Sequence, residues 1–169
     1  MARQDQGNSG VDNIEDHVGY DPEAGSFFWK IRKSGRRLNG RAGYVGAQGY
    51  YHVEVNGQDF FGQKLAWYLH HGEWPPHEVD HIDGNPSNNR LVNLRLATHQ
   101  QNCSNRRIPI TNTSGIKGVH WHKAAGKWAA VIKVNQRGIH LGTFENKEDA
   151  AKAYWEAAQK YHGKFARVA

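Results

Sequence analysis

The residues best suited to chemistry in this sequence are an adjacent Asp80 and His81, followed by Asn93 and Asn102. Carboxylate and amide oxygens suit a hard cation such as Mg²⁺, so Asp80 and Asn102 could hold one between them. The imidazole of His81, placed beside the metal, could take a proton from water, and Asn93 could accept the other ring N–H and fix the tautomer. Hydrolysis of a phosphodiester requires such a set: a base, a metal on the phosphate and an orienting group.

Short elements around a turn are expected to position these side chains. Residues 79–82 and 91–94 have the pattern of two short strands, and residues 83–86, Asp-Gly-Asn-Pro, form a turn between them. Residues 97 to about 104 are predicted to form a helix. The Asp-His pair then faces a helix that carries Asn102.

The same residue types also have an ordinary structural interpretation. An adjacent Asp and His is common in proteins and by itself indicates no site. Asp83, Asn85, Asn88 and Asn89 are of the types that hydrogen-bond their own backbone in loops, and His99 is of the type found exposed on a helix.

The spacing and the intervening residues resemble the HNH endonucleases, specifically the free-standing homing-type nucleases with a ββα-metal motif. Asn93 lies thirteen residues after Asp80 and Asn102 nine further on, and residues 83–95 read DGNPSNNRLVNLR. The resemblance implies that Asp80 and Asn102 bind a single divalent metal ion, Mg²⁺ or else Mn²⁺. It also implies that His81 is the general base and that Asn93 orients it.

Two further positions bear on this resemblance. His99, one helical turn before Asn102, is an alternative metal ligand, since other branches of the superfamily use a histidine on this helix. Residues 20–76 resemble the N-terminal part of homing-type HNH proteins, in which His-Arg-Leu-Ala-Trp is expected. This chain has Gln-Lys-Leu-Ala-Trp at residues 63–67, so the role of that histidine is in question at Gln63.

The last third of the chain has the most regular pattern. Residues 116–123, 128–134 and 137–143 are predicted to form three strands, and Asn146 is the expected N-cap of a helix that runs to Tyr161. Alternation along the strands places one apolar set toward the helix: Val119, Trp121, Trp128, Ala130, Ile132, Ile139 and Leu141. The residues between them then point outward together: His120, His122, Lys127, Lys133 and His140.

This segment resembles the APETALA2/ethylene-response DNA-binding domain, in which a three-stranded sheet lies in the major groove. The resemblance rests on SGIKGVHWH at residues 114–122, GKWAAVIK at residues 126–133 and IHLGTF at residues 139–144. Several Arg and Trp contact positions of the plant pattern are His, Lys, Val131 or Gly138 here. We therefore expect docking of the sheet on DNA rather than a specific base readout.

The charge distribution also points to a polyanion partner. Residues 1–105 carry 10 Lys and Arg against 12 Asp and Glu, whereas residues 106–169 carry 12 against 4. A second basic cluster lies in a stretch without acidic residues. The basic and histidine residues predicted to contact DNA are Lys30, Arg32, Lys33, Arg36, Arg37, Arg41, Lys117, His120, His122, Lys127, Lys133, Arg137 and His140. A solvated basic surface is the alternative interpretation.

Several classes of protein are excluded by composition. No apolar run approaches the ~20 residues of a membrane-spanning helix. The first ten residues contain no apolar signal segment, and a lone Cys103 is incompatible with an internal disulfide framework or a Cys-rich zinc finger. We therefore expect an intracellular protein, in the cytoplasm or nucleoid of a bacterial host, that is not secreted.

The predicted fold is α+β, with modules in series. A flexible lead-in (1–18) precedes an HNH nuclease domain (19–105), whose β-rich N-terminal portion leads into a ββα-metal motif (78–105). A linker (106–114) then joins a DNA-binding domain (115–169), which is a three-stranded antiparallel sheet packed on one helix.

The predicted function is metal-dependent hydrolysis of DNA phosphodiester bonds by an HNH endonuclease of the homing or phage type. One divalent metal ion is the expected cofactor and double-stranded DNA the expected partner, with no membrane and no small-molecule cofactor. The resemblance implies products with 5′-phosphate and 3′-hydroxyl ends. The alternatives are a DNA-binding regulator with an inert nuclease motif, and an RNA-directed nuclease or RNA-binding protein.

Overall fold

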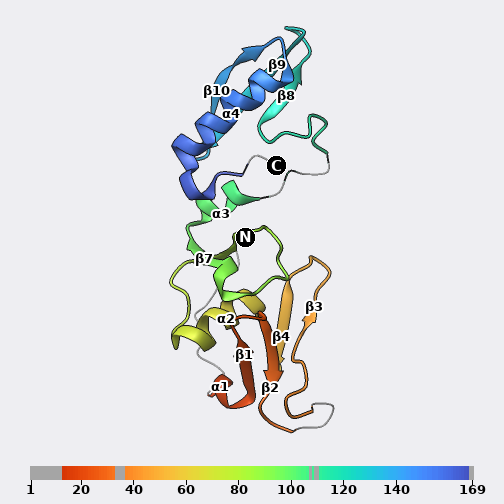
Figure 1. Cartoon of the computed structure of the whole chain (residues 1–169), viewed down its shortest axis with the longest axis vertical. Helices are drawn as coiled ribbons and strands as arrows, with labels where there is room; N and C mark the ends of the chain where they lie inside the picture. The colour runs from red at the N-terminus through yellow and green to blue at the C-terminus, as the bar shows by residue number, and fades with distance from the viewer. Residues whose placement is uncertain (1–12, 33–36, 107, 109–110, 168–169) are drawn as a thin grey trace. The chain divides into compact units, whose positions relative to one another are not determined.

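The computed structural model describes all residues except 1–12, 33–36, 107, 109–110 and 168–169. The chain divides into two compact units, Met1–Leu96 and Ala97–Ala169 (Figure 1). The predicted Lys33 and Arg36 lie outside the described residues, as do the first twelve residues of the predicted lead-in. Among the described residues, no helix combines the length and apolar character that crossing a membrane would need.

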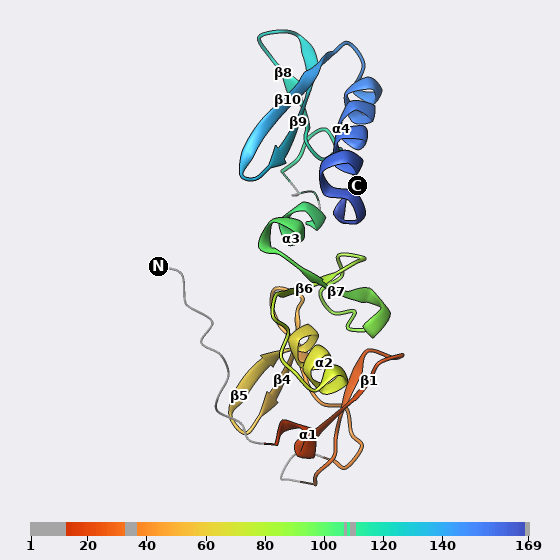
Figure 2. The ribbon, with the colours of Figure 1, turned by 90° about the vertical axis from the view of Figure 1, so that its left-hand side faces the viewer.

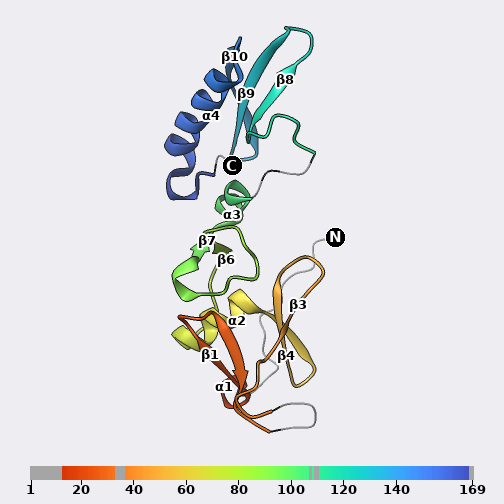
Figure 3. The same cartoon turned by 45° about the vertical axis from the view of Figure 1, so that its right-hand side comes forward.

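The first unit is built from short strands and two helices, of which α2 is the longer. Its elements are α1 (Ile14–His17), β1 (Val18–Asp21), β2 (Ser26–Trp29), β3 (Tyr44–Val45), β4 (Tyr51–Val55), β5 (Gln58–Phe61), α2 (Gly62–His71), β6 (Glu78–His81), the 3-10 turn η1 (Leu91–Asn93) and β7 (Leu94–Ala97). β1 pairs with β2, and β4 lies between β3 and β5, all antiparallel. Figure 3 shows β3 alongside β4. The Asn56-Gly57 turn joins β4 to β5, and both residues have positive φ, as the sequence predicts.

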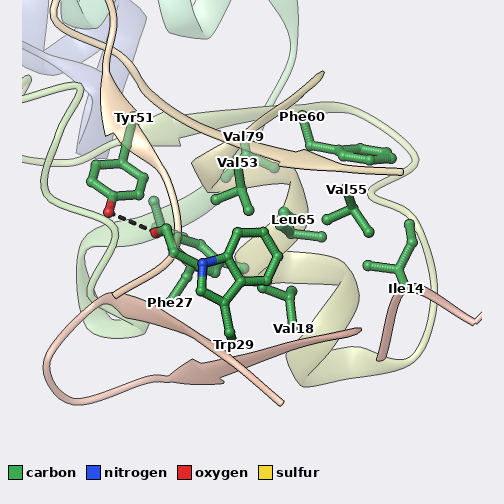
Figure 4. Close-up of a cluster of buried hydrophobic side chains, with 13 residues drawn as sticks. Ile14, Val18, Phe27, Trp29, Tyr51, Val53, Val55, Phe60, Leu65 and Val79 are labelled. Atoms are coloured by element: carbon green, nitrogen blue, oxygen red, sulfur yellow. Dashed lines mark hydrogen bonds between the residues drawn. The ribbon is translucent and has the colours of Figure 1, made fainter. Parts of the chain in front are cut away.

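One apolar cluster holds the first unit together. Phe27, Val53 and Leu65 are almost completely buried and come from β2, β4 and α2. Figure 4 shows these side chains meeting those of the neighbouring strands and α1. The hydroxyl of Tyr51 donates to the carbonyl of Ala42 at 2.8 Å within the same region.

The end of the predicted flexible lead-in is folded, which corrects that prediction. Residues Ile14–His17 form α1, and Val18 begins β1. Ile14 and Val18 are 2% and 0% exposed and belong to the core of the first unit. Their four-residue spacing places both apolar side chains on the side of the core. The first unit therefore includes residues that we had expected outside it.

The predicted second strand of the nuclease motif begins later than expected. Residues Leu91–Asn93 form the 3-10 turn η1, and the strand β7 starts at Leu94. The turn is closed by a bond from Asn93 N to Arg90 O at 2.8 Å. Ile82 N donates to Asn93 O at 2.9 Å, so the backbone of Asn93 still pairs with the segment that follows β6.

The second unit begins with the helix α3 (His99–Asn105). Thr98 caps it, with Gln101 N donating to Thr98 Oγ1 at 3.3 Å and Thr98 N donating to Gln101 Oε1 at 2.8 Å. This reciprocal capping box satisfies two N–H groups that the helix leaves unpaired. The predicted helix is therefore confirmed, with its first residue two positions later than expected.

A sheet backed by one helix forms the rest of the second unit. The elements are β8 (Val119–His122), β9 (Lys127–Val134), β10 (Arg137–Phe144), α4 (Lys147–His162) and the 3-10 turn η2 (Gly163–Phe165). β9 lies between β8 and β10, all antiparallel, and α4 packs along one face of the sheet (Figure 2). The core is formed by Val119, Ala130, Ile132, Ala150, Tyr154, Ala157 and Ala158. The predicted three-stranded sheet on one helix is confirmed.

Trp121 is the exception to the predicted inward set. Its register opposite Trp128 places it on the same face as Val119, but it is 46% exposed. β8 is an edge strand, and Trp121 packs edge-to-face on Trp128 with ring centroids 5.3 Å apart. Trp121 therefore packs against Trp128 at the edge of the sheet and is not buried as we expected.

Candidate active site and nucleic-acid interface

His81 is the last residue of β6 and is almost completely buried. The residue is 6% exposed. Burial lowers the pKa of His81 below its ordinary value of 6.5, although the bond to Asn89 and the carboxylates of Asp83 and Asp80 act to raise it. Because a lowered pKa keeps the ring neutral near pH 7, the imidazole has a lone pair with which to accept a proton.

The side chain bonded to the His81 ring comes from Asn89. Nε2 of His81 and Oδ1 of Asn89 are 3.1 Å apart in a buried contact. This differs from the prediction that Asn93 orients His81. The sequence gives Asn89 no distinguishing signal, because it stands among several asparagines of a turn.

Asn93 holds the loop that follows His81. Its Oδ1 accepts from Asp83 N at 3.0 Å, and its Nδ2 donates to Asp83 Oδ1 at 3.0 Å and to Asn88 O at 2.8 Å. Burial acts to raise the pKa of Asp83, but the bonds from Asn85, Asn88 and Asn93 hold it below its ordinary value. The buried carboxamide of Asn93 therefore stabilises the turn instead of contacting the imidazole.

Asp80 is held by an arginine that sequence reasoning missed. Nε and Nη2 of Arg95 lie 2.9 and 2.8 Å from Oδ2 of Asp80. The side chains of Arg95 and Asp80 are 13% and 5% exposed, so this is a nearly buried ion pair. Arg95 lies on β7, beside β6, and neighbouring strands bring alternate residues onto one face. The strand predicted from the sequence, residues 91–94, stops one residue short of Arg95.

The predicted metal ligands are divided between the two units. Asp80 lies on β6 of the first unit, whereas Asn102 and the alternative ligand His99 lie on α3 of the second. His99 is exposed, and its Nε2 lies 3.6 Å from Cys103 Sγ. The part of the chain that the structure describes contains no group of three His, Cys, Asp or Glu side chains able to hold a metal. A carboxylate with an amide is a smaller set, and its oxygen donors fit a hard divalent cation.

Gln63 occupies the first turn of α2 and is buried, at 8% exposed. Its Oε1 has no hydrogen-bond partner among the described residues. An amide at this position cannot take up a proton or supply an imidazole nitrogen to a metal, as a histidine could.

Most residues that were predicted to point outward from the C-terminal sheet share one side of it. In the strand register, His120 lies opposite Ala129, His122 opposite Lys127, and His140 opposite Val131. Lys133, opposite Gly138, shares their side of the sheet because alternate residues of a strand point the same way. Lys127 is also paired with Glu145 at 2.8 Å. The exposed cation and histidines therefore lie on the sheet face away from α4.

Two residues of the predicted DNA-binding set lie elsewhere. Lys117 is half-buried, and its Nζ donates to the carbonyls of Ser104 at 2.5 Å and Arg106 at 2.8 Å. Its ammonium thus binds carbonyls at the end of α3. Arg137 lies opposite Val134, whose side chain packs on the core beneath α4, so Arg137 does not share the outward face.

The described part of the N-terminal basic cluster is exposed. Lys30, Arg32, Arg37 and Arg41 are all exposed residues. Lys30 Nζ donates to Glu15 O at 3.0 Å, and Arg41 Nε donates to the hydroxyl of Tyr51 at 3.0 Å. These bonds leave the cluster on the surface of the first unit, available to a polyanion.

Two segments of the chain match known protein families. Residues 62–103 match the HNH endonuclease family, and residues 114–164 match the AP2 domain. Protein 3.8 of Escherichia phage T7 is 36% identical over 103 residues, which cover 60% of this chain and 84% of that protein. The chain belongs to the HNH endonuclease family. It is a nuclease with an AP2 domain in its second unit, and DNA is its partner.

Two more distant likenesses accompany these matches. An ethylene-responsive transcription factor-like protein of Arabidopsis thaliana is 33% identical over 81 residues, which are 47% of this HNH endonuclease and 35% of the plant protein. A solved structure describes DNA binding and cleavage by the HNH homing endonuclease I-HmuI. It has a TM-score of 0.41 and 18% identity over 86% of this chain and 85% of that one.

Proposed function

We propose that this HNH endonuclease hydrolyses double-stranded DNA with the help of one divalent metal ion, Mg²⁺ or Mn²⁺. The proposal is supported chiefly by the buried His81 next to Asp80, whose carboxylate is fixed by Arg95. Asp80 and Asn102 would hold the ion. When bound, the ion would stabilise negative charge on the phosphate and on the leaving oxygen.

His81 acts on the attacking water in this proposal. Its unprotonated ring nitrogen accepts a proton as the water oxygen bonds to phosphorus, and the P–O3′ bond breaks. The products are a 5′-phosphate and a 3′-hydroxyl, once the leaving oxygen has gained a proton. Asn93 contributes by holding the Asp83–Asn88 turn, which begins two residues after His81.

The two units divide the work of binding DNA. The outward face of the AP2 sheet carries His120, His122, Lys133 and His140, which suits the groove of a duplex. The exposed Lys30, Arg32, Arg37 and Arg41 of the first unit supply phosphate contacts without sequence preference. The phage T7 relative supports a phage-type or homing-type nuclease that acts inside a bacterial host.

A plasmid assay tests the metal dependence and the substrate. Incubation of supercoiled plasmid with the chain and Mg²⁺ or Mn²⁺ should give nicked or linear product, and EDTA should stop the reaction. Duplex DNA should compete better than RNA of the same sequence. Binding without cleavage under every metal condition would favour the alternative that the AP2 domain suggests, a DNA-binding regulator with an inert nuclease motif.

A further inference from the structure

Asn89 is a buried polar residue that the proposed mechanism does not use. It is 1% exposed and is among the largest fully buried side chains of the chain. Asp83 and Asn85 of the same turn are exposed, and Asn85 N donates to Asp83 Oδ1. Asn89 instead contacts the ring of the proposed base, with 3.1 Å between its Oδ1 and Nε2 of His81.

The backbone of Asn89 is held by the hairpin between β1 and β2. The hydroxyl of Tyr20 donates to Asn89 O at 2.6 Å, and burial, with a smaller contribution from Asp21, raises the pKa of Tyr20 to about 12. The hydroxyl therefore remains a donor at every working pH. Next to Asn89, Leu91 N donates to Pro22 O at 3.0 Å. Two bonds thus join the hairpin to the segment that carries Asn89.

The close approach of this hairpin depends on a glycine. At Gly25, a Cβ atom would lie 2.4 Å from Arg90 N, and its φ of +68° is unfavourable for residues with a side chain. Arg90 Nε also donates to Glu23 O at 2.6 Å. The hairpin turn therefore packs directly on the backbone that follows Asn89.

The carboxamide of Asn89 is confined from the other side by the start of α2. A Cβ atom at Gly62 would lie 2.7 Å from Asn89 Nδ2, so glycine makes room for the amide. Nδ2 itself has no partner among the described residues. A buried donor without a partner is energetically unfavourable, so the orientation of the amide affects the stability of the site.

We propose that Asn89 is a positioning residue that selects the Nε2–H tautomer of His81, and that Tyr20 and the β1–β2 turn hold Asn89 in place. If Oδ1 accepts from Nε2–H, the neutral ring carries its lone pair on Nδ1. Nδ1 is then the atom that takes the proton from water. This inference rests on the proposed role of His81 as base, and the amide orientation is its testable element.

Nitrogen NMR of the full chain, without DNA or metal, tests the tautomer directly. Spectra that correlate ring protons with both ring nitrogens are recorded at a pH where His81 is neutral, and the His81 signals are assigned by their loss in His81→Gln. We expect Nε2 to carry the proton in the wild-type protein. A proton on Nδ1 would overturn the proposal, since Asn89 would then present Nδ2 to the ring.

Substitutions at Asn89 test its effect on the reaction. Asn89→Leu removes the acceptor, and we expect a loss of the Nε2–H preference and a fall in cleavage rate of about 10–100-fold. Asn89→Asp keeps an acceptor and should recover most of the rate and the tautomer. Asn85→Leu, in the exposed part of the turn, is the matched control and should leave both unchanged. A wild-type tautomer and rate in folded Asn89→Leu would overturn the proposal.

Tyr20→Phe tests the hairpin contact with the smallest change to the fold. Loss of one hydroxyl should reduce the cleavage rate several-fold while the affinity for DNA stays unchanged. An unchanged rate would show that Tyr20 does not position Asn89. Because the NMR readout needs no activity, absence of cleavage by the wild-type chain would refute the proposed function without bearing on the tautomer.

Discussion

Arg95 binds a single oxygen of Asp80 with two of its nitrogens, Nε at 2.9 Å and Nη2 at 2.8 Å. Both side chains are nearly buried, at 13% and 5% exposed. The carboxylate that we expect to bind the metal is therefore fixed by a cation on the neighbouring strand. The same contact links β6 to β7 and holds the carboxylate of the predicted metal ligand in place, so it should affect both stability and activity.

Removal of Arg95 should destabilise the first unit more than removal of the whole pair. Arg95→Met leaves a buried carboxylate without its partner, and we expect a loss of about 3–5 kcal/mol in the free energy of unfolding. Asp80→Asn combined with Arg95→Met leaves no buried charge and should cost less than Arg95→Met alone. Urea denaturation of the two chains provides the comparison. Equal losses would mean that the ion pair contributes nothing specific.

The two predicted metal ligands should respond differently to added metal. Asp80 supplies a charge to the ion and Asn102 only an amide dipole, so excess Mg²⁺ should restore cleavage in Asn102→Ala better than in Asp80→Ala. The measurement is a titration of cleavage rate against Mg²⁺ for both variants. Equal recovery of the cleavage rate in the two variants would point to a different ligand set. If His99→Ala is also inactive and excess Mg²⁺ restores its cleavage but not that of Asn102→Ala, the ligand set would likewise differ from the one predicted.

The outward face of the AP2 sheet should govern part of the salt dependence of DNA binding. Lys133→Ala removes one expected phosphate contact, so the slope of log affinity against log salt should become shallower by about 0.9. Lys152 is exposed on α4, which packs on the opposite face of the sheet, and Lys152→Ala is the matched control. The same slope for both variants would mean that this face does not contact DNA.

Lys117 should make the stability of the second unit depend on pH. Burial, followed by Arg167, lowers the pKa of Lys117 from 10.5 to about 8, and Arg106 also lowers it while Cys103 raises it. Between pH 8 and 10.5 the unfolded chain holds a proton that the folded protein has lost. Stability therefore rises with pH through this window and is lowest below it.

Urea denaturation across that window, with and without Lys117→Met, checks the sign. The urea midpoint of the wild-type protein should rise with pH more steeply than that of the variant. Both chains keep Cys103 and the nearby arginines, so the difference between them reports on Lys117. Parallel curves would show that the ammonium of Lys117 is no more costly in the folded protein than in water.

The sequence predicts the elements well where local patterns are strong. The alternation of Val119, Ala130 and Ile132 predicts the inner face of the sheet, and Asn56-Gly57 predicts the hairpin turn. The Thr98–Gln101 capping box was also readable from its spacing and would have placed the start of α3 correctly.

Contacts between distant segments could not be predicted in this way. Asn89 has the same residue type as its neighbours in the turn, and only the packing of the β1–β2 hairpin, 69 residues away at Tyr20, distinguishes it. Lys117 looks like any basic residue near a DNA-binding sheet until its bonds to the carbonyls at the end of α3 are known. Both depend on tertiary structure, in which a side chain's partner lies far away in the sequence.

Cleavage of duplex DNA by His81→Ala, measured beside the wild-type chain and His77→Ala, is the decisive test of His81 as the general base. His77 is exposed and precedes β6, so its loss should leave the reaction unchanged. With Mg²⁺ present, we expect His81→Ala to bind DNA with near wild-type affinity and to cut it ~10²–10⁴-fold more slowly. Near wild-type cleavage by folded His81→Ala would contradict the assignment of His81 as the general base.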